Sequence, residues 1–253
     1  MRCLIKKGFI LIFLLALTAG CSGHKNKVME DKSVAELYNK AMDYAEENEY
    51  KEAVKYFDEV ERQHPYSPWA AKAQIMSAYM YYKNAEYTDA VLAINRFLQL
   101  HPGNKYAPYA QYLKGMSYYE QISDVERDQD MTQMAMETFN RLIVLYPNTP
   151  YAKDVKNKLV LTHNHLGGKE MDIGRYYLKQ KKYGAAINRF ADVVRNYQTT
   201  MHIEEALYRL TAGYLALGLK EEAKRSAAVL GYNYPSSKWY RKAYRLLQKN
   251  GVS

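Results

Sequence analysis

The sequence predicts an all-α protein, an α-solenoid built from five helix-turn-helix repeats. Three observations predict it: a short segment centred on alanine recurs, with a tyrosine nine residues before it and a proline twelve residues after it. The period is 37 residues, close to the length of repeats that each form one helical hairpin. Such hairpins bury their apolar faces by stacking on their neighbours. The central alanines are Ala53, Ala90, Ala135, Ala186 and Ala223.

Each recurring position has a physical role in pairing two helices. A small residue stands three positions before each tyrosine, and with the central alanine it lets two antiparallel helices approach closely. The proline ends the second helix because it has no backbone N–H to continue it. In the fourth repeat Gln198 takes its place. The small residues are Ala41, Ala78, Gly115, Gly174 and Thr211. The pattern resembles the tetratricopeptide (TPR) repeat.

Two segments interrupt the period. Repeat three carries an eight-residue insert between its helices, at 123–130. Fourteen extra residues at 154–170 predict a lengthened helix between repeats three and four, which we expect to end at Gly167-Gly168 as a helix C-cap. We therefore expect repeats one to three in 33–153, and the connecting helix with repeats four and five in 154–253.

The first 20 residues have the pattern of a secretory signal. Basic residues precede an apolar run, and small residues follow it. That run is too short to favour a transmembrane helix. The segment T-A-G-C, ending at Cys21, resembles the lipobox of bacterial lipoproteins, with Thr18 where leucine is usual. We expect a signal peptide in 1–20, a lipid on Cys21 and a flexible tether in 21–32; the alternative is an ordinary signal peptide with an accidental cysteine.

Charge and residue types disfavour several functions. Loss of the signal segment lowers the formal net charge from +9 to +6, and no basic block of the nucleic-acid-binding type remains. His163 and His165 are two residues apart, so on a helix they point in different directions and cannot share a metal. Solenoids also lack the deep pockets that catalysis needs. We expect no metal, no cofactor, no nucleic acid partner and no enzymatic activity.

Protein binding remains. The first helix of each TPR lines the concave groove, and here that groove is rich in tyrosine and methionine, which suit varied apolar peptides. The alternative is that several of these side chains pack between repeats. Repeats four and five offer a more polar surface at Arg175, Lys179 and Arg209, and we expect a different partner there. The expected peptide groove comprises Tyr38, Met42, Ile75, Met76, Tyr79, Tyr82, Tyr109, Tyr112, Met116 and Tyr119.

Three stretches resemble the BamD family, the TPR lipoproteins of the outer-membrane β-barrel assembly machinery. They are H-P-Y-S-P-W-A (64–70), the insert with R-D-Q-D in 123–130, and F-N-R-L-I-V-L-Y-P-N-T-P-Y-A (139–152). The resemblance implies a lipid-anchored subunit on the periplasmic face of the outer membrane. It implies binding of a BamA-like barrel insertase through the C-terminal repeats, and possible contacts with accessory Bam lipoproteins. It also implies that the N-terminal groove receives the aromatic-rich targeting signals, ending in phenylalanine, of unfolded outer-membrane proteins.

A different role stays open, that of a TPR lipoprotein scaffold for peptidoglycan or cell-division proteins. A related protein of that kind usually carries an N-terminal coiled coil. Residues 22–33 are too few for one and show no heptads. The sequence therefore favours barrel assembly.

Overall fold

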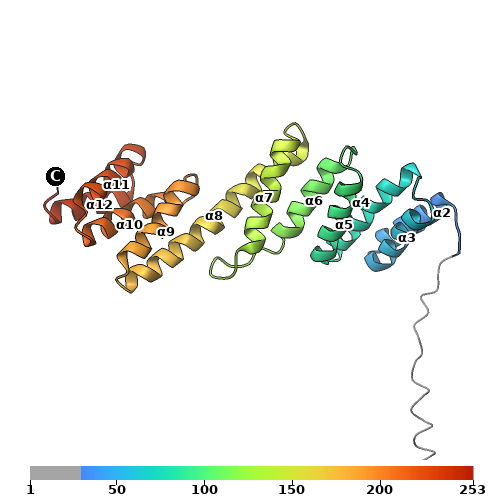
Figure 1. Cartoon of the computed structure of the whole chain (residues 1–253), viewed down its shortest axis with the longest axis horizontal. Coiled ribbons are helices and arrows are strands. Elements are labelled where there is room, and N and C mark those ends of the chain that lie inside the picture. Colours follow the sequence, from blue (N-terminus) through green and yellow to red (C-terminus); the bar gives the residue numbers. More distant parts are fainter. Residues whose placement is uncertain (1–29, 253) are drawn as a thin grey trace, which may run out of the picture. The chain divides into compact units, whose positions relative to one another are not determined.

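The computed structural model describes residues 30–252, and residues 33–253 form one compact unit. The expected signal peptide and Cys21 lie outside the described residues. Within 30–252 every regular element is a helix, which confirms the all-α prediction (Figure 1). The helices are α2 (Val34–Glu46), α3 (Tyr50–Gln63), α4 (Pro68–Lys83), α5 (Tyr87–Leu100), α6 (Ala107–Tyr119), α7 (Asp130–Leu145), α8 (Pro150–Lys179), α9 (Tyr183–Asn196), α10 (Ile203–Ala216), α11 (Lys220–Asn233) and α12 (Lys238–Lys249).

Consecutive helices form hairpins, and each hairpin packs on the next along the chain, as a solenoid requires. In four of the five hairpins a tight turn joins the two helices, with one residue in the left-handed region. These residues are Asn48, Ala85, Lys181 and Gly218, with φ values of 62°, 57°, 59° and 77°. The first two stand one 37-residue period apart, and so do the last two. A 37-residue spacing therefore recurs in the backbone of these two pairs of hairpins.

The small residues of the pattern let helices approach closely. A Cβ atom added at Gly115 of α6 would lie 2.3 Å from Cε1 of Phe139 in α7. At Gly174 of α8 an added Cβ atom would lie 2.5 Å from Cε1 of Phe190 in α9. Both phenylalanines are fully buried. The small and aromatic positions thus meet inside the hairpin, as the sequence pattern indicates.

Helix α8 is continuous from Pro150 to Lys179, so the prediction that a helix ends at Gly167-Gly168 is wrong. Both glycines are buried within the helix. A Cβ atom added at Gly167 would lie 3.2 Å from Cβ of Tyr197, and one at Gly168 would lie 3.2 Å from Nε2 of His202. The glycines therefore let the loop between α9 and α10 lie directly on α8 instead of ending it.

The insert of repeat three also rests on α8. The ammonium group of Lys169 donates hydrogen bonds to the carbonyl oxygens of Glu126 and Arg127, at 2.6 and 3.0 Å. Val125 approaches the same helix, since its Cγ1 atom lies 3.2 Å from a Cβ atom added at Gly168. The insert and the lengthened helix are thus two parts of one local packing arrangement.

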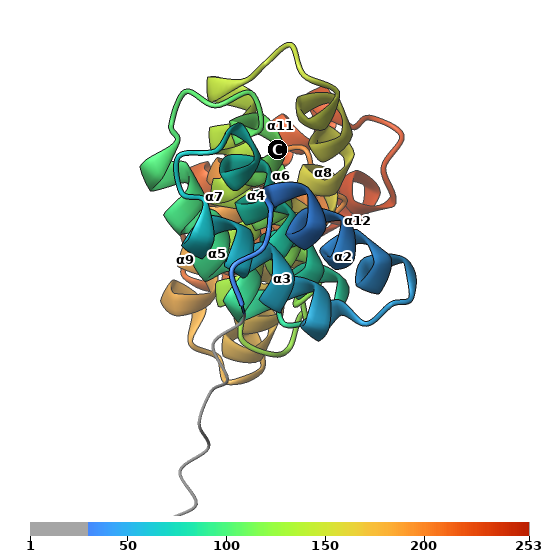
Figure 2. The ribbon, with the colours of Figure 1, turned by 90° about the vertical axis from the view of Figure 1, so that its right-hand side faces the viewer.

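One more helix, α12, follows the five hairpins, in a segment that the sequence pattern assigned to repeat five. It packs on both α10 and α11 (Figure 1). Its buried side chains Ala243 and Leu247 belong to the core that it shares with these helices. The view in Figure 2, turned by 90°, looks onto α2 and α3, at the opposite end of the helix order from α12. A last helix with one polar face is the usual way to cap a solenoid.

Candidate functional site

Three of the ten predicted groove residues are buried. Tyr38, Ile75 and Met116 expose 5%, 3% and 9% of their surface. The Tyr38 ring contacts the rings of Phe57 and Trp69, with centroid distances of 5.3 and 4.8 Å. These three side chains pack between helices, which was the alternative to a role in ligand binding. They offer little surface to a ligand.

The other seven predicted groove residues are half-buried: Met42, Met76, Tyr79, Tyr82, Tyr109, Tyr112 and Tyr119. The two methionines pack at the edge of the first core, between α2, α3 and α4. Four of the tyrosines meet further along the chain, where α4, α6 and the start of α8 come together. The structure thus brings part of the predicted set into one place.

We call this group of five rings the tyrosine cluster: Tyr79, Tyr82, Tyr109, Tyr112 and Tyr151. Tyr79 stacks on Tyr82 and also contacts Tyr109, with centroids 6.4 Å apart in both pairs. Tyr151 connects the two tyrosines of α6, at 5.6 Å from Tyr109 and 5.2 Å from Tyr112. These separations are in the range at which aromatic rings attract each other. The result is a continuous aromatic surface over three helices.

Carboxylates hold the phenol groups of two of these rings. The Tyr112 hydroxyl donates to Oδ2 of Asp154 at 2.9 Å, and the Tyr82 hydroxyl donates to Oε1 of Glu120 at 3.2 Å. Lys158 pairs with Asp154 at 3.0 Å. Each ring therefore keeps an apolar face beside a fixed polar edge, which is the combination that makes tyrosine frequent in binding surfaces.

Three phenols of the cluster, those of Tyr82, Tyr109 and Tyr112, stay uncharged at neutral pH. Burial, followed by the hydrogen bond to Asp154, raises the pKa of the Tyr112 phenol to about 12. Burial also raises the pKa values of Tyr82 and Tyr109 above the usual phenol range. The hydrogen bond from Lys158 lowers the pKa of Asp154, so this carboxylate stays ionised and keeps accepting. The phenols thus remain hydrogen-bond donors.

Sequence reasoning missed Tyr151, and a short signal in the sequence could have found it. The segment P-W-A at 68–70 recurs as P-Y-A at 108–110 and again at 150–152. In each case a helix begins near the proline, and the aromatic residue after it packs on a tyrosine of the preceding first helix. This helix-start aromatic residue connects the aromatic surface of one repeat to that of the next.

The predicted polar surface in repeats four and five is largely an internal network. Arg175 pairs with Asp172 and lies 3.4 Å from Oε1 of Glu205. Arg209 contacts the same Glu205 oxygen at 3.1 Å. Lys179, at the end of α8, is exposed. Arg175 and Arg209 thus share the Glu205 carboxylate of their own chain, and only Lys179 of the three predicted residues is exposed.

Clusters of metal-binding side chains and membrane-spanning helices are both absent from residues 30–252. In that range no three histidine, cysteine or acidic side chains come together as a metal site would need. His163 instead lies edge-on to the ring of Tyr197, at a centroid distance of 6.2 Å. None of the helices in the same range combines the length and apolar character that crossing a bilayer requires.

Comparison with known proteins decides the family. The model of a family described as outer membrane lipoprotein (YfiO) matches residues 30–230. An outer membrane protein assembly factor BamD of Caulobacter vibrioides is 47% identical over 95% of this chain and 80% of its own length. The chain belongs to the BamD family. BamD of Rickettsia prowazekii is 45% identical over 94% of this chain and 95% of its own length.

More distant BamD proteins match as well. BamD of Neisseria meningitidis is 33% identical over 90% of this chain and 89% of its own length. These relatives are named assembly factors, and membership of their family supports association with the outer membrane. The comparisons do not favour the peptidoglycan or cell-division scaffold. Among solved structures, the P58(IPK) TPR domain gives a TM-score of 0.43 at 12% identity over 86% of this chain and 65% of that chain, a weak likeness.

Proposed function

We propose that this BamD-family chain is a lipid-anchored scaffold of the outer-membrane β-barrel assembly complex. A lipid on Cys21 holds it at the periplasmic face of the outer membrane, and residues 22–32 act as the tether. The N-terminal hairpins bind the targeting signals of unfolded barrel proteins. The C-terminal hairpins bind a BamA-like insertase, and accessory Bam lipoproteins join this complex. The protein works by binding and positioning, without catalysing a reaction.

The tyrosine cluster carries the substrate part of this proposal. It offers apolar ring faces over α4, α6 and the start of α8, in a region that the chain leaves half-exposed. An aromatic or aliphatic side chain buried against such a surface gains about 1.5–3 kcal/mol. Signals rich in aromatic residues and ending in phenylalanine match this chemistry.

The carboxylates beside the cluster give the proposed site selectivity for unfolded chains. Asp154 and Glu120 already accept hydrogen bonds from Tyr112 and Tyr82, and both carboxylates have further lone pairs. They can accept backbone N–H groups of an extended peptide that lies along the rings. A folded barrel strand has those N–H groups paired within its sheet. The surface therefore favours unfolded chains.

The proposed insertase site contains Arg175 of α8 and Arg209 of α10, which both contact Glu205. We call these three residues the arginine network. Glu205 holds Arg175 and Arg209 in place, so their guanidinium groups are ordered before a partner arrives. Ordered donors lose less side-chain entropy when they bind a carboxylate. Exposed Lys179 supplies a further positive charge nearby on α8. An acidic surface of the insertase fits this arrangement.

The test measures the affinity of a synthetic peptide that is rich in aromatic residues and ends in phenylalanine. One variant replaces Tyr79, Tyr82 and Tyr112 with serine. Loss of aromatic anchors at a binding hot spot costs 2 kcal/mol or more, so we expect an affinity at least about 30-fold weaker.

The matched control replaces three exposed tyrosines outside the cluster with serine: Tyr66, Tyr176 and Tyr232. We expect its peptide affinity to equal that of the unchanged protein. Circular dichroism checks that both variants keep their helices. Equal affinities in the cluster variant and the control would reject the cluster as the substrate site.

A further inference from the structure

Helix α12 carries an exposed stripe of positive charge. Its twelve residues include five lysines and arginines and no acidic residue. With 3.6 residues per turn, the five fall within an arc of about 100° around the helix. The buried side chains Ala243 and Leu247 lie on the opposite face. All five cations are exposed: Lys238, Arg241, Lys242, Arg245 and Lys249.

These cations differ from the other charged residues of the protein in their partners. Among residues 30–252, the ion pairs that join lysine or arginine to a carboxylate involve α3, α5 and α8–α10, and none of them involves a cation of α12. Lys238 and Lys242 lie over the ring of Trp239 instead, at 5.4 and 4.4 Å from its centroid. The charge of the stripe is therefore not neutralised within the molecule.

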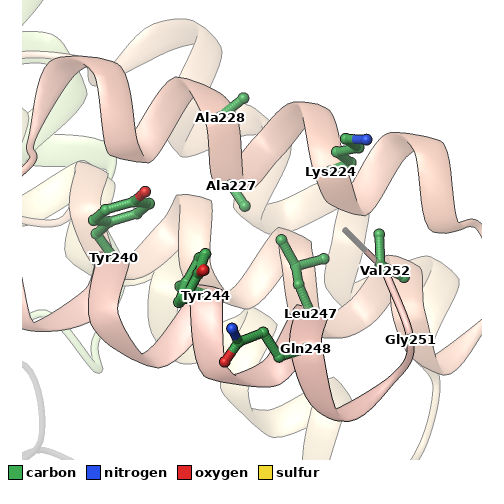
Figure 3. Close-up of a pocket in the computed structure, with 9 residues that line it drawn as sticks. All are labelled: Lys224, Ala227, Ala228, Tyr240, Tyr244, Leu247, Gln248, Gly251 and Val252. Atoms are coloured by element: carbon green, nitrogen blue, oxygen red, sulfur yellow. The ribbon is translucent and has the colours of Figure 1, made fainter.

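An apolar hollow lies beside the stripe, between α11 and α12 (Figure 3). It has a volume of about 630 Å³. Tyr240, Tyr244 and Leu247 line it from α12, Ala227 lines it from α11, and Val252 lies at its end (Figure 3). Tyr244 is 52% exposed and stands between the hollow and the cations. Four to eight lysines and arginines clustered on an amphipathic helix are typical of binding to anionic lipids. Tyrosine is frequent at the level of the headgroups, where its ring contacts the lipid and its hydroxyl contacts water.

We propose that this α12 surface binds anionic phospholipids of the membrane. The headgroup phosphates contact the five cations, and the apolar hollow beside Tyr244 receives the glycerol and upper acyl region of one lipid. A membrane surface spreads its negative charge over many headgroups, so it attracts a row of cations without a fixed pairing of individual groups. Three of the five cations are lysines, which are depleted at protein–protein interfaces. The charge and composition of the stripe therefore favour lipid over an acidic protein.

The stripe lies on α12, which carries no residue of the peptide groove, and it borders Arg209 at the ring of Trp239. Lipid bound there gives the protein a second contact with the membrane. Each lysine or arginine near an anionic surface strengthens binding about fivefold at low salt. Reversal of two such charges is therefore expected to weaken the contact by two orders of magnitude or more. Salt screens the attraction, so the contact is also expected to weaken as ionic strength rises.

Lysine footprinting on the full mature protein in vesicles tests the inference. The amines are acetylated briefly, and mass spectrometry gives the rate at each lysine. The vesicles contain either phosphatidylcholine alone or phosphatidylcholine with 30% phosphatidylglycerol. We expect Lys238, Lys242 and Lys249 to react at least threefold more slowly in the anionic vesicles, with the difference lost in high salt. The exposed lysines Lys153 and Lys156 of α8 report in the same sample and are expected to react equally in both.

A pair of variants sharpens the test. Arg241→Glu with Arg245→Glu is expected to abolish the protection of the three lysines, whereas Lys153→Glu with Lys156→Glu leaves it unchanged. Equal rates in both kinds of vesicle would overturn the inference. Protection that requires added insertase and not anionic lipid would also overturn it, and would make the stripe a protein site. Flotation of the protein with vesicles of phosphatidylcholine alone measures membrane binding by the lipid on Cys21 separately.

Discussion

The two halves of the solenoid use one hairpin design but present different surfaces. In the N-terminal half, the aromatic residue at a helix start joins other rings, as Tyr151 joins Tyr109 and Tyr112. In the C-terminal half, Trp239 packs on Tyr208 in the same way, but the guanidinium of Arg209 lies over both rings. The repeat specifies the buried positions of each hairpin and leaves its surface free. Two kinds of binding surface can therefore occur on one scaffold.

The largest expected effect tests whether the halves form one structural unit. Phe139→Ala in α7 and Phe190→Ala in α9 each remove a fully buried ring. We expect each to cost about 3–5 kcal/mol of unfolding free energy. Because α8 runs through both halves, with Val155 in the α7 core and Met171 in the α9 core, we expect each variant to lower a single unfolding transition.

Thermal and urea unfolding of the two variants provides the measurement. Tyr66→Ala is the control, since this side chain is 99% exposed and contributes little. Two separated transitions, with only one moved by each variant, would show that the halves unfold independently and would contradict the expectation.

The second prediction compares two glycines that face a buried ring with one that faces the loop between α9 and α10. Gly115→Ala and Gly174→Ala place a methyl group 2.3 and 2.5 Å from a buried ring, so we expect each to destabilise by about 1–3 kcal/mol. Gly167→Ala meets its neighbour at 3.2 Å, and the gain in helix propensity of about 1 kcal/mol offsets the contact. Urea unfolding measures all three. If Gly167→Ala lowered the unfolding free energy as much as Gly115→Ala, the loop that lies on α8 could not move to make room for the methyl group.

These glycines also show how far the sequence leads. The small–aromatic–alanine spacing predicts the hairpins because every repeat must bury the same contact. Gly167-Gly168 has no repeat equivalent, and a glycine pair at the end of an apolar stretch is typical of a helix C-cap. Its partner Tyr197 is distant along the chain, so only the folded structure identifies the pair as a packing site.

The proposed binding surface also shows what periodicity can and cannot predict. Periodicity predicts that the same helix face carries Tyr79, Tyr82, Tyr109 and Tyr112. In the structure these tyrosines do lie close together. Periodicity cannot tell how deep each side chain lies, because Tyr38 and Tyr79 share a face but differ in what covers them. Trp69 at the next helix start covers Tyr38, whereas the rings near Tyr79 leave it half-exposed.

The third prediction is that ionic strength changes partner affinity by different amounts in the two halves. Peptide binding to the tyrosine cluster depends on apolar contact, so we expect its affinity to change less than about twofold between low and high salt. Insertase binding through Arg175, Lys179 and Arg209 depends on charge, and we expect it to weaken about tenfold or more over the same range. Titration calorimetry of each partner measures both. Equal salt dependence would contradict the division of labour.

The smallest effect concerns Asp154, which joins Tyr112 to Lys158. Its side chain is 47% exposed, so Asp154→Asn is expected to cost less than about 1 kcal/mol. The pKa of Asp154 is lowered in the folded chain from the ordinary 3.8. Its contribution is therefore present above that value and is lost as the pH falls through the lowered folded pKa. Urea unfolding at neutral and strongly acidic pH measures this difference.

Wild type and the Asp154→Asn variant are expected to become equal in stability only at pH values below 3.8. A difference that persists unchanged in acid would show that the Asp154 side chain acts through packing and not through charge.

Site-specific photo-crosslinking can show whether the two halves bind different partners. A photoreactive phenylalanine analogue replaces either Tyr112 in the cluster or Tyr176 in α8, which is 57% exposed. The account predicts that position 112 crosslinks to an unfolded barrel protein, and that position 176 crosslinks to the insertase or to nothing. Unfolded barrel protein captured at position 176 and absent at position 112 would contradict it.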